Sequence, residues 1–242
     1  MKIESFYSDY FLKFNVISTD SRKVVKDSIF ISLSGENFNG NRFASSALEN
    51  GAALAVVDDA DFFVDNGKYV LVDDSLTFLQ KLANYHRTHF NCPVLAIAGT
   101  NGKTTTKELV AGALSLKFKT YYTQGNLNNQ IGVPLTLLSV NPNDAQFVVV
   151  EMGANHLTDI QELCDIAQPD YALVTSVGKA HLEGFGSIDA VVKTKTDLYR
   201  FVEKNHGICF VNADSELLMN NKPNSNFILY GTNRNDVYLT CW

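Results

Sequence analysis

The feature that most limits how this chain can fold is an apolar run that ends in a glycine-rich loop. Val94–Ala98 is continuously apolar and is followed by Gly-Thr-Asn-Gly-Lys-Thr-Thr-Thr at 99–106, after which a helical pattern covers 104–116. Strands that are apolar at every position are buried on both faces, as in a parallel sheet. In such sheets, ligands bind at the carboxyl ends of the strands, which is where this loop lies.

The same alternation of apolar runs and helical patterns continues to the end of the chain. Further runs occur at 147–150, 171–177, 207–211 and 227–230, and helical patterns occur at 158–167 and 188–202. This order predicts a mostly parallel sheet that is covered by helices on both sides.

The first third of the chain has a different pattern of apolar residues, with short strand-like runs at 29–33, 53–57 and 69–72. A helix is expected over 43–50, ending at Gly51, and a longer one begins at Ser75 as its N-cap. The longer helix should end before Pro93. We therefore predict an α/β protein with a small N-terminal α/β domain at 1–91 and a phosphate-loop domain at 92–242, whose sheet is incomplete.

Composition excludes several classes of protein. A net charge of −6 and a pI near 5.3 leave no general basic surface for nucleic acid. No signal segment opens the chain, and no apolar stretch approaches the roughly 18 residues of a membrane helix. The four cysteines, Cys92, Cys164, Cys209 and Cys241, are scattered, which favours free thiols. We expect a cytoplasmic protein.

The loop at 99–106 is suited to holding a polyphosphate. Its glycines let backbone N–H groups approach phosphate oxygens, and the following helix adds its positive N-terminal dipole. Lys103 supplies a cation for the β- and γ-phosphates, and the Thr104 hydroxyl can bind Mg²⁺. Ile97 stands where the common phosphate-loop pattern has glycine. The expected phosphate-binding residues are Gly99, Thr100, Asn101, Gly102, Lys103, Thr104 and Thr105.

Three further polar residues follow predicted strands or lie on the next helix. Glu151 ends a buried strand, where an acid beside a phosphate loop typically holds Mg²⁺. His181 follows the third strand, although a single histidine is more often structural. Lys193 and Lys195 lie on the helix at 188–202, and from the residues alone both could simply be exposed.

Together these segments resemble the Mur ligase family. The matching pieces are TDSR at 19–22, GNLNNQIGVPLTLL at 125–138, EMGANH at 151–156, HLEGFGS at 181–187 and KTKTDLY at 193–199. The forms of the second, third and fourth pieces are most similar to the branch of the family that joins D-alanyl-D-alanine to UDP-N-acetylmuramoyl-tripeptide.

The resemblance implies an ATP-dependent ligase of peptidoglycan synthesis. Such enzymes activate a carboxylate as an acyl phosphate, and an amine then attacks to form an amide. By resemblance, Lys103, Lys195 and His181 are catalytic. Two Mg²⁺ ions are expected, with Thr104, Glu151, His181 and a carbamylated Lys195 as their protein ligands.

The resemblance also assigns the substrate region. Thr19, Asp20, Ser21 and Arg22 would bind the UDP-linked substrate, and Arg22 is a natural partner for phosphate or carboxylate. Asn126, Asn128 and Asn129 would contact its sugar and peptide through amide hydrogen bonds. Residues 35–40 occupy the place of another substrate loop, but a segment rich in asparagine and glycine is usually only a turn.

Members of this family have a third, C-terminal domain, and the resemblance stops before it. We therefore expect a monomer that binds the UDP-linked substrate, and ATP weakly, without ligation. The alternatives are a non-catalytic nucleotide-sugar-binding fragment, a related Mur or folylpolyglutamate-type ligase with another substrate and, less well supported, a generic phosphate-loop ATPase.

Overall fold

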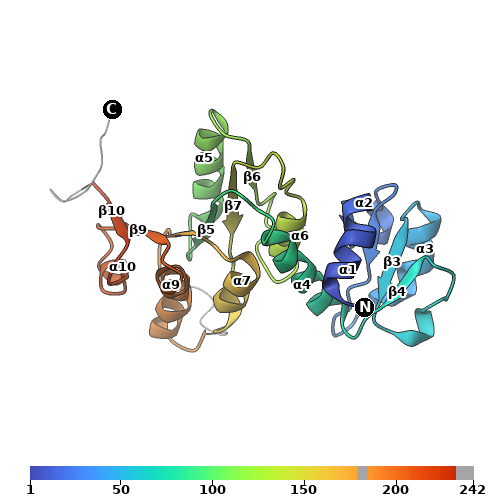
Figure 1. Cartoon of the computed structure of the whole chain (residues 1–242). Helices are drawn as coiled ribbons and strands as arrows, with labels where there is room; N and C mark the ends of the chain where they lie inside the picture. The colour runs from blue at the N-terminus through green and yellow to red at the C-terminus, as the bar shows by residue number, and fades with distance from the viewer. Residues whose placement is uncertain (179–184, 233–242) are drawn as a thin grey trace. The chain divides into compact units, whose positions relative to one another are not determined.

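The computed structural model describes residues 1–178 and 185–232 (Figure 1). The chain divides into two compact units. The first comprises Met1–Thr88 with Leu137–Ser139, and the second comprises His89–Thr136 with the residues from Val140 onward.

The first unit contains a small parallel sheet with strand order β1-β2-β3-β4. The predicted runs at 29–33, 53–57 and 69–72 correspond to β2, β3 and β4. Its elements are α1 (Ile3–Phe6), η1 (Tyr7–Phe11), α2 (Leu12–Phe14), β1 (Ile17–Ser18), η2 (Ser21–Lys23), β2 (Ile29–Ile31), η3 (Gly40–Phe43), α3 (Ala44–Glu49), β3 (Leu54–Val57), η4 (Ala60–Phe62), β4 (Tyr69–Leu71) and α4 (Ser75–Arg87).

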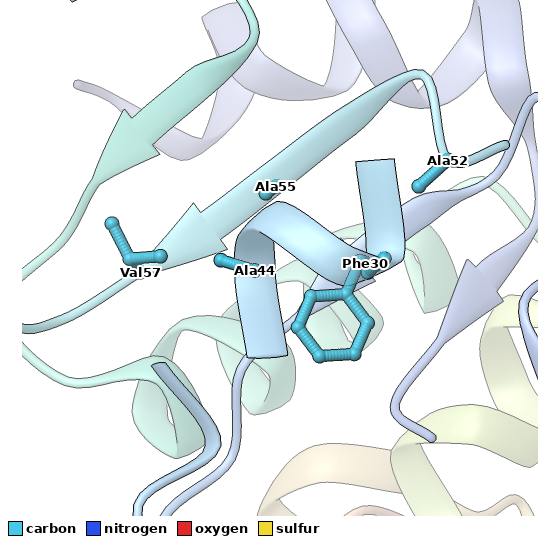
Figure 2. Close-up of a cluster of buried hydrophobic side chains, with 6 residues drawn as sticks. Phe30, Ala44, Ala52, Ala55 and Val57 are labelled. Atoms are coloured by element: carbon cyan, nitrogen blue, oxygen red, sulfur yellow. The ribbon is translucent and has the colours of Figure 1, made fainter. Parts of the chain in front are cut away.

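Helix α3 packs on one face of this sheet. Figure 2 shows Ala44 of α3 with Phe30 of β2 and Val57 of β3, and all three side chains are almost fully buried. Small residues on the helix let it approach the strands closely, so the aromatic ring of Phe30 fills the space between them. This contact fixes the segment η3 that leads into α3.

Helix α4 begins where the sequence predicts, but its cap differs from the prediction. Asp74, not Ser75, is the N-cap, and its carboxylate accepts a hydrogen bond from the Thr77 N–H at 2.6 Å. Ser75 is instead the first helical residue and is fully buried. A carboxylate is the better cap because it also interacts favourably with the helix dipole.

The second unit is built on a six-stranded sheet with strand order β10-β9-β8-β5-β7-β6, and every pair between the described strands is parallel. The predicted α/β class and parallel sheet are therefore confirmed. The elements are β5 (Val94–Ala98), α5 (Lys103–Ser115), β6 (Thr120–Tyr122), α6 (Gly132–Leu138), β7 (Phe147–Glu151), α7 (Asp159–Ala167), β8 (Tyr171–Val174), α9 (Ile188–Lys204), β9 (Ile208–Asn212), α10 (Glu216–Met219) and β10 (Phe227–Tyr230).

Helices lie on both sides of this sheet, with α5 on one side and α7 and α9 on the other (Figure 1). On the α5 side, Leu95, Ile97 and Val149 form a buried cluster against Val110 and Leu114. Because β5 lies between β7 and β8, the carboxyl ends of these three strands meet at one edge. The polar residues that follow them are thereby brought together.

Within residues 1–178 and 185–232, no helix is long and apolar enough to cross a membrane. Cys164 and Cys209 are buried free thiols, as the sequence predicts. Cys92 is also buried, and Cys241 lies outside the described residues.

Candidate functional site

The loop between β5 and α5 depends on two glycines with positive φ. Gly99 has φ of +141° and Gly102, the N-cap of α5, has φ of +81°. A Cβ atom on Gly99 would lie 2.1 Å from Thr175 Oγ1, so a side chain fits neither the backbone conformation nor the space. The loop therefore passes directly over the end of β8.

Two hydroxyl residues at the end of β8 anchor the loop. The Thr100 N–H donates to the Ser176 carbonyl at 2.8 Å, and the Thr175 hydroxyl donates to the Asn101 carbonyl at 2.7 Å. The Asn101 N–H donates to Ser176 Oγ at 3.1 Å. The sequence analysis missed Thr175 and Ser176, and their only signal was their position directly after an apolar strand.

Helix α5 starts directly from this loop. Its first N–H groups, those of Lys103, Thr104 and Thr105, have no intrahelical acceptors, as in any helix, and lie at the positive end of the dipole. The Lys103 ammonium donates to the carbonyls of Gly99 and Thr100 at 2.9 and 3.1 Å. Burial lowers the pKa of Lys103, and the nearby Glu151 partly opposes that shift. Backbone donors and one cation thus converge on a single concave loop.

Glu151 lies at the carboxyl end of β7, and its carboxylate faces two ways. Oε1 accepts hydrogen bonds from the Thr104 hydroxyl at 3.2 Å and from Asn128 Nδ2 at 2.8 Å. Oε2 is buried and has no hydrogen-bond partner among the described residues. A buried carboxylate oxygen without a donor, paired with a hydroxyl, is a donor set that suits a hard cation such as Mg²⁺.

No cluster of three or more His, Cys, Asp or Glu side chains that could hold a metal occurs in the part of the chain that the structure describes. Beside the loop, the Thr104 hydroxyl and the Glu151 carboxylate lie together as two oxygen donors for a cation. His181 and Glu183 lie outside the described residues.

The two lysines of α9 differ sharply. Lys193 is exposed, whereas Lys195 is only 3% exposed and donates to the Ala154 carbonyl at 3.0 Å. Its ammonium lies 5.6 Å from the ring centroid of Phe185. Burial, reinforced by the charge of Lys103, lowers the pKa of Lys195 to about 8, although Asp159 opposes the shift. Lys195 is therefore a buried amine whose neutral form is favoured relative to that of an ordinary lysine.

Lys103 and Lys195 line the same cavity, which has a volume of about 190 Å³. Its wall is formed by the phosphate loop, the loops after β6 and β7, the start of α7, the segment before α9, and α9. The lining residues are Gly99, Thr100, Lys103, Asn128, Asn129, Gln130, Gly153, Ala154, Asn155, Asp159, Phe185, Val191 and Lys195. The structure thus brings the predicted loop, the predicted lysine and two of the predicted asparagines together.

Asp159 organises the wall of this cavity, and the sequence analysis missed it. Its Oδ2 accepts the N–H groups of Asn155 and His156 at 2.7 and 2.9 Å. Its Oδ1 accepts from Gln130 Nε2 at 2.8 Å. One carboxylate therefore ties together two loops that are far apart in sequence, a role that no local pattern reveals.

The three predicted asparagines take different positions. Asn128 reaches Glu151, as described above. Asn129 Oδ1 accepts from the N–H groups of Ile131 and Gly132 at the start of α6, so its oxygen has a structural role. Asn126 is exposed and does not line the cavity.

In the first unit, Thr19, Asp20, Ser21 and Arg22 line a separate cavity of about 410 Å³. The Arg22 Nε and Nη2 atoms both donate to Asp20, at 2.9 Å each, and this hydrogen bonding lowers the pKa of Asp20 to about 2. The Arg22 side chain remains 85% exposed and can still meet an anionic ligand. The cavity combines this charge with aromatic residues.

Those aromatic residues are Phe38 and Phe43, whose rings stack with centroids 5.4 Å apart. Phe38 lies in the segment 35–40 that the resemblance places at a substrate loop, whereas no feature of the sequence singled out Phe43. Phe38 closes a tight turn with Gly35, in which each backbone N–H donates to the other residue's carbonyl. A Cβ on Gly40 would lie 2.1 Å from the Leu33 carbonyl oxygen, so this segment is a true glycine turn that also presents a ring to a cavity.

Comparison with known proteins agrees with this arrangement. The Mur ligase middle domain family matches residues 97–240, and the family described as Mur ligase family, catalytic domain matches residues 13–87. The UDP-N-acetylmuramoyl-tripeptide--D-alanyl-D-alanine ligases of Escherichia coli and Synechocystis sp. are 39% and 36% identical to the chain. The alignments cover 85% and 95% of this chain, and 45% and 51% of those enzymes.

Solved structures give the same picture. The MurF ligase of Thermotoga maritima in complex with ADP is 32% identical, with a TM-score of 0.81 over 91% of this chain and 51% of its own. A MurF structure from Acinetobacter baumannii, also 32% identical, gives 0.80 over 89% and 48%. The chain spans about half the length of the curated relatives it matches. On the strength of the middle-domain match, which covers more than half of its residues, the chain belongs to the Mur ligase family.

Proposed function

We propose that this chain supplies the UDP-substrate-binding and ATP-binding parts of a ligase that adds D-alanyl-D-alanine to UDP-N-acetylmuramoyl-tripeptide. The observation that carries the proposal is the cavity lined by both Lys103 and Lys195, beside the Thr104–Glu151 pair. A phosphate loop alone fits many NTPases. A second, buried lysine facing the same space suits a reaction in which a phosphoryl group is passed to a carboxylate.

ATP is the proposed nucleotide, and the loop between β5 and α5 is its polyphosphate site. The N-terminal N–H groups of α5 would receive the phosphate oxygens, since a helix N-terminus binds anions readily. Lys103 would leave the carbonyls of Gly99 and Thr100 and pair with the β- and γ-phosphates. The exchange replaces two neutral acceptors with charged ones, which form stronger hydrogen bonds.

Mg²⁺ would be held by the Thr104 hydroxyl and by Glu151, directly or through water. When bound, the cation offsets the charge that builds up on the transferred phosphoryl group. The residues fit this task because the Thr104 hydroxyl already lies 3.2 Å from Glu151 Oε1 and the second carboxylate oxygen lacks a donor. A second Mg²⁺, with His181 and a modified Lys195 as ligands, belongs to the same proposal.

Lys195 is the proposed site of carbamylation. The ammonium would first lose one proton, and the neutral amine would then attack carbon dioxide, forming an N–C bond as one C–O π bond opens and releasing a second proton, so that a cation becomes an anion. The support is its burial and its pKa of about 8, which leave more neutral amine near physiological pH than an exposed lysine has. Lys193, by contrast, is exposed.

The first unit would hold the uridine diphosphate part of the substrate. Arg22 offers a charge-assisted, bidentate partner for a phosphate, and the stacked rings of Phe38 and Phe43 offer a surface for a base. Asn126, Asn128 and Asn129 are proposed to contact the sugar and peptide. In the overall reaction, ATP and the tripeptide carboxylate give an acyl phosphate and ADP. The amine of D-alanyl-D-alanine then displaces phosphate.

Thermal unfolding of the chain with UDP-N-acetylmuramoyl-tripeptide, with Mg-ATP and with neither tests the binding part of this proposal. Ligands that bind only the folded state raise the melting temperature by mass action. We expect both to do so, and Arg22→Ala to remove the response to the UDP-tripeptide while keeping the response to Mg-ATP. A folded chain that responds to neither ligand would contradict the proposal.

A further inference from the structure

Lys107 is a fully buried cation to which the proposed chemistry assigns no role. It lies on α5, one turn after Lys103 and Thr104, and its side chain has no exposed surface. Residues three and four apart share one face of a helix, so Lys107 projects from the same face as the two phosphate-loop residues. Because no part of its side chain is exposed, it cannot touch a bound ligand.

The Lys107 ammonium has three polar partners from three segments of the chain, and it also lies 5.9 Å from the ring centroid of Tyr122. It donates to the Gly125 carbonyl at 3.1 Å, lies 3.0 Å from Glu108 Oε1, and lies 3.9 Å from Glu151 Oε2. The Glu151 oxygen that faces Lys107 is the one without a hydrogen-bond donor. Glu151 is therefore held between Thr104 and Asn128 on one oxygen and the charge of Lys107 on the other.

The two carboxylate partners are unequal. The Glu108 side chain is 52% exposed, and ion pairs with exposed groups are weakened by solvent. The Glu151 side chain is 1% exposed, so its attraction to Lys107 is little screened. Removing Lys107 would leave the buried Glu151 carboxylate without this ion-pair partner.

Lys107 also fixes the segment that carries the asparagines. Gly125 begins the loop to α6, and Asn128 of that loop both donates to Glu151 and accepts the Gly153 N–H at 2.7 Å. One ammonium therefore contacts both the Glu151 carboxylate and the loop that supplies a hydrogen bond to it.

We propose that Lys107 is a positioning residue for the cation site: it holds Glu151 and the Gly125 loop so that Thr104 and Glu151 can bind Mg²⁺ together with the nucleotide. The inference rests on the proposed function, because it assumes a divalent cation at this pair. Lys107 acts through Glu151 and contacts no substrate.

Its positive charge would also repel a cation, so the two effects must be weighed. Lys107 lies beside two carboxylates, which compensate its charge locally, and it faces Oε2 of Glu151, whereas Thr104 donates to Oε1. The positioning effect should therefore exceed the repulsion. Partners that orient metal ligands typically change metal affinity by about 10- to 100-fold.

The test measures the dissociation constant of ATP with excess EDTA and with saturating Mg²⁺, for the wild-type chain, Lys107→Gln and Lys117→Gln. Glutamine keeps a donor for the Gly125 carbonyl and removes the charge, and Lys117 is an exposed lysine just after α5. The ratio of the two constants is the gain from Mg²⁺. We expect Lys107→Gln to lower this ratio on the order of tenfold. The dissociation constant of ATP in EDTA should change by less than about twofold. Lys117→Gln should match the wild type.

If Lys107 has a purely structural role, Lys107→Gln should raise the ATP dissociation constant by the same factor in EDTA and in Mg²⁺. The ratio would then be unchanged, which would overturn the inference. A ratio that rises would do the same, since repulsion would then dominate. If the wild-type chain binds ATP equally with and without Mg²⁺, the proposed function fails and this inference fails with it.

If Lys107→Gln folds poorly, the stability of a double variant still tests the pairing of Lys107 with Glu151. The single variant leaves Glu151 charged and buried, whereas Lys107→Gln/Glu151→Gln neutralises both groups. If Lys107 and Glu151 are coupled, the double variant should be more stable than Lys107→Gln alone. Equal or lower stability would contradict the pairing on which the inference depends.

Discussion

Thr104 and Glu151 are 47 residues apart in sequence, yet the Thr104 hydroxyl donates to Glu151 Oε1 at 3.2 Å. Thr104 lies in the first turn of α5, and Glu151 is the last residue of β7. The parallel pairing of β5 with β7 brings both to the same edge of the sheet, with Ile97 opposite Glu151. The fold itself therefore assembles the hydroxyl and the carboxylate.

The first prediction concerns this pair. Thr104→Val removes the hydroxyl, and we expect it to reduce the gain in ATP affinity from Mg²⁺ by roughly tenfold or more, because one proposed ligand is lost. Thr104→Ser keeps the hydroxyl and should retain most of the gain. Titration of ATP with and without Mg²⁺ measures both. Equal behaviour of the two variants would remove Thr104 from the cation site.

The second prediction concerns the turn at Gly99. Gly99→Ala should destabilise the second unit by about 2 kcal/mol or more, because of its positive φ and the close approach to Thr175 Oγ1. Gly112→Ala is the matched control, since a Cβ at this α5 position meets no atom within 4 Å. That change should stabilise by about 0.5–1 kcal/mol. Urea unfolding measures both, and a Gly99→Ala chain as stable as wild type would contradict the geometry.

Much of the second unit could be predicted because its strands are buried on both faces. The apolar run Val94–Ala98 and the glycine loop leave few alternatives for that segment. By contrast, β6 was missed, because Thr120, Tyr121 and Tyr122 are only partly buried and form no apolar run. The spacing of apolar residues predicts which positions are buried, so it does not identify an edge strand that is half exposed.

The N-terminal segment shows a different reason for failure. Phe6 and Tyr7 are buried in a helical stretch, but charged and polar neighbours obscure the pattern. Their partners lie on α4: Phe6 meets Phe78 edge-on at 4.8 Å, and the Tyr7 hydroxyl bonds His86 Nδ1 at 2.8 Å. Tertiary contacts, not local propensity, decide such a segment.

The site divides in the same way. Residues within the loop and at strand ends, such as Lys103 and Glu151, could be predicted from chemistry and position. Thr175 and Ser176 could not, because they act through hydrogen bonds to the Asn101 backbone, which is distant in sequence. Asp159 could not, because it also binds the Gln130 side chain of a separate loop. Such bonds exist only once the sheet has formed.

The third prediction concerns the cavity of the first unit. Phe38 is 57% exposed, so Phe38→Ala should change stability little, but it removes a stacking surface for the proposed uridine. We expect the affinity for UDP-N-acetylmuramoyl-tripeptide to fall by up to about tenfold, the size of one aromatic contact. Val64→Ala, at a residue 49% exposed outside this cavity, is the control. Calorimetry measures both, and unchanged binding by Phe38→Ala would place the base elsewhere.

The last prediction is a pH dependence of stability that arises from Lys195. Burial lowers its pKa from an ordinary value of 10.5 to about 8 in the folded chain. Below pH 8 both folded and unfolded chains carry the charge, so its cost to folding is fully present and constant. Between pH 8 and 10.5 the unfolded chain binds more protons, so stability rises with pH. Above 10.5 this contribution levels off.

Comparison of wild type with Lys195→Met isolates this effect. In buffer free of carbon dioxide, the free energy of unfolding of wild type relative to Lys195→Met should increase between pH 8 and 10.5, by at most about 3 kcal/mol. Lys193→Met, which removes the exposed lysine of the same helix, is the control for the loss of a lysine from this helix. A difference between wild type and Lys195→Met that stays constant over this range would mean that Lys195 titrates like an exposed lysine. The proposed carbamylation would then lose its support.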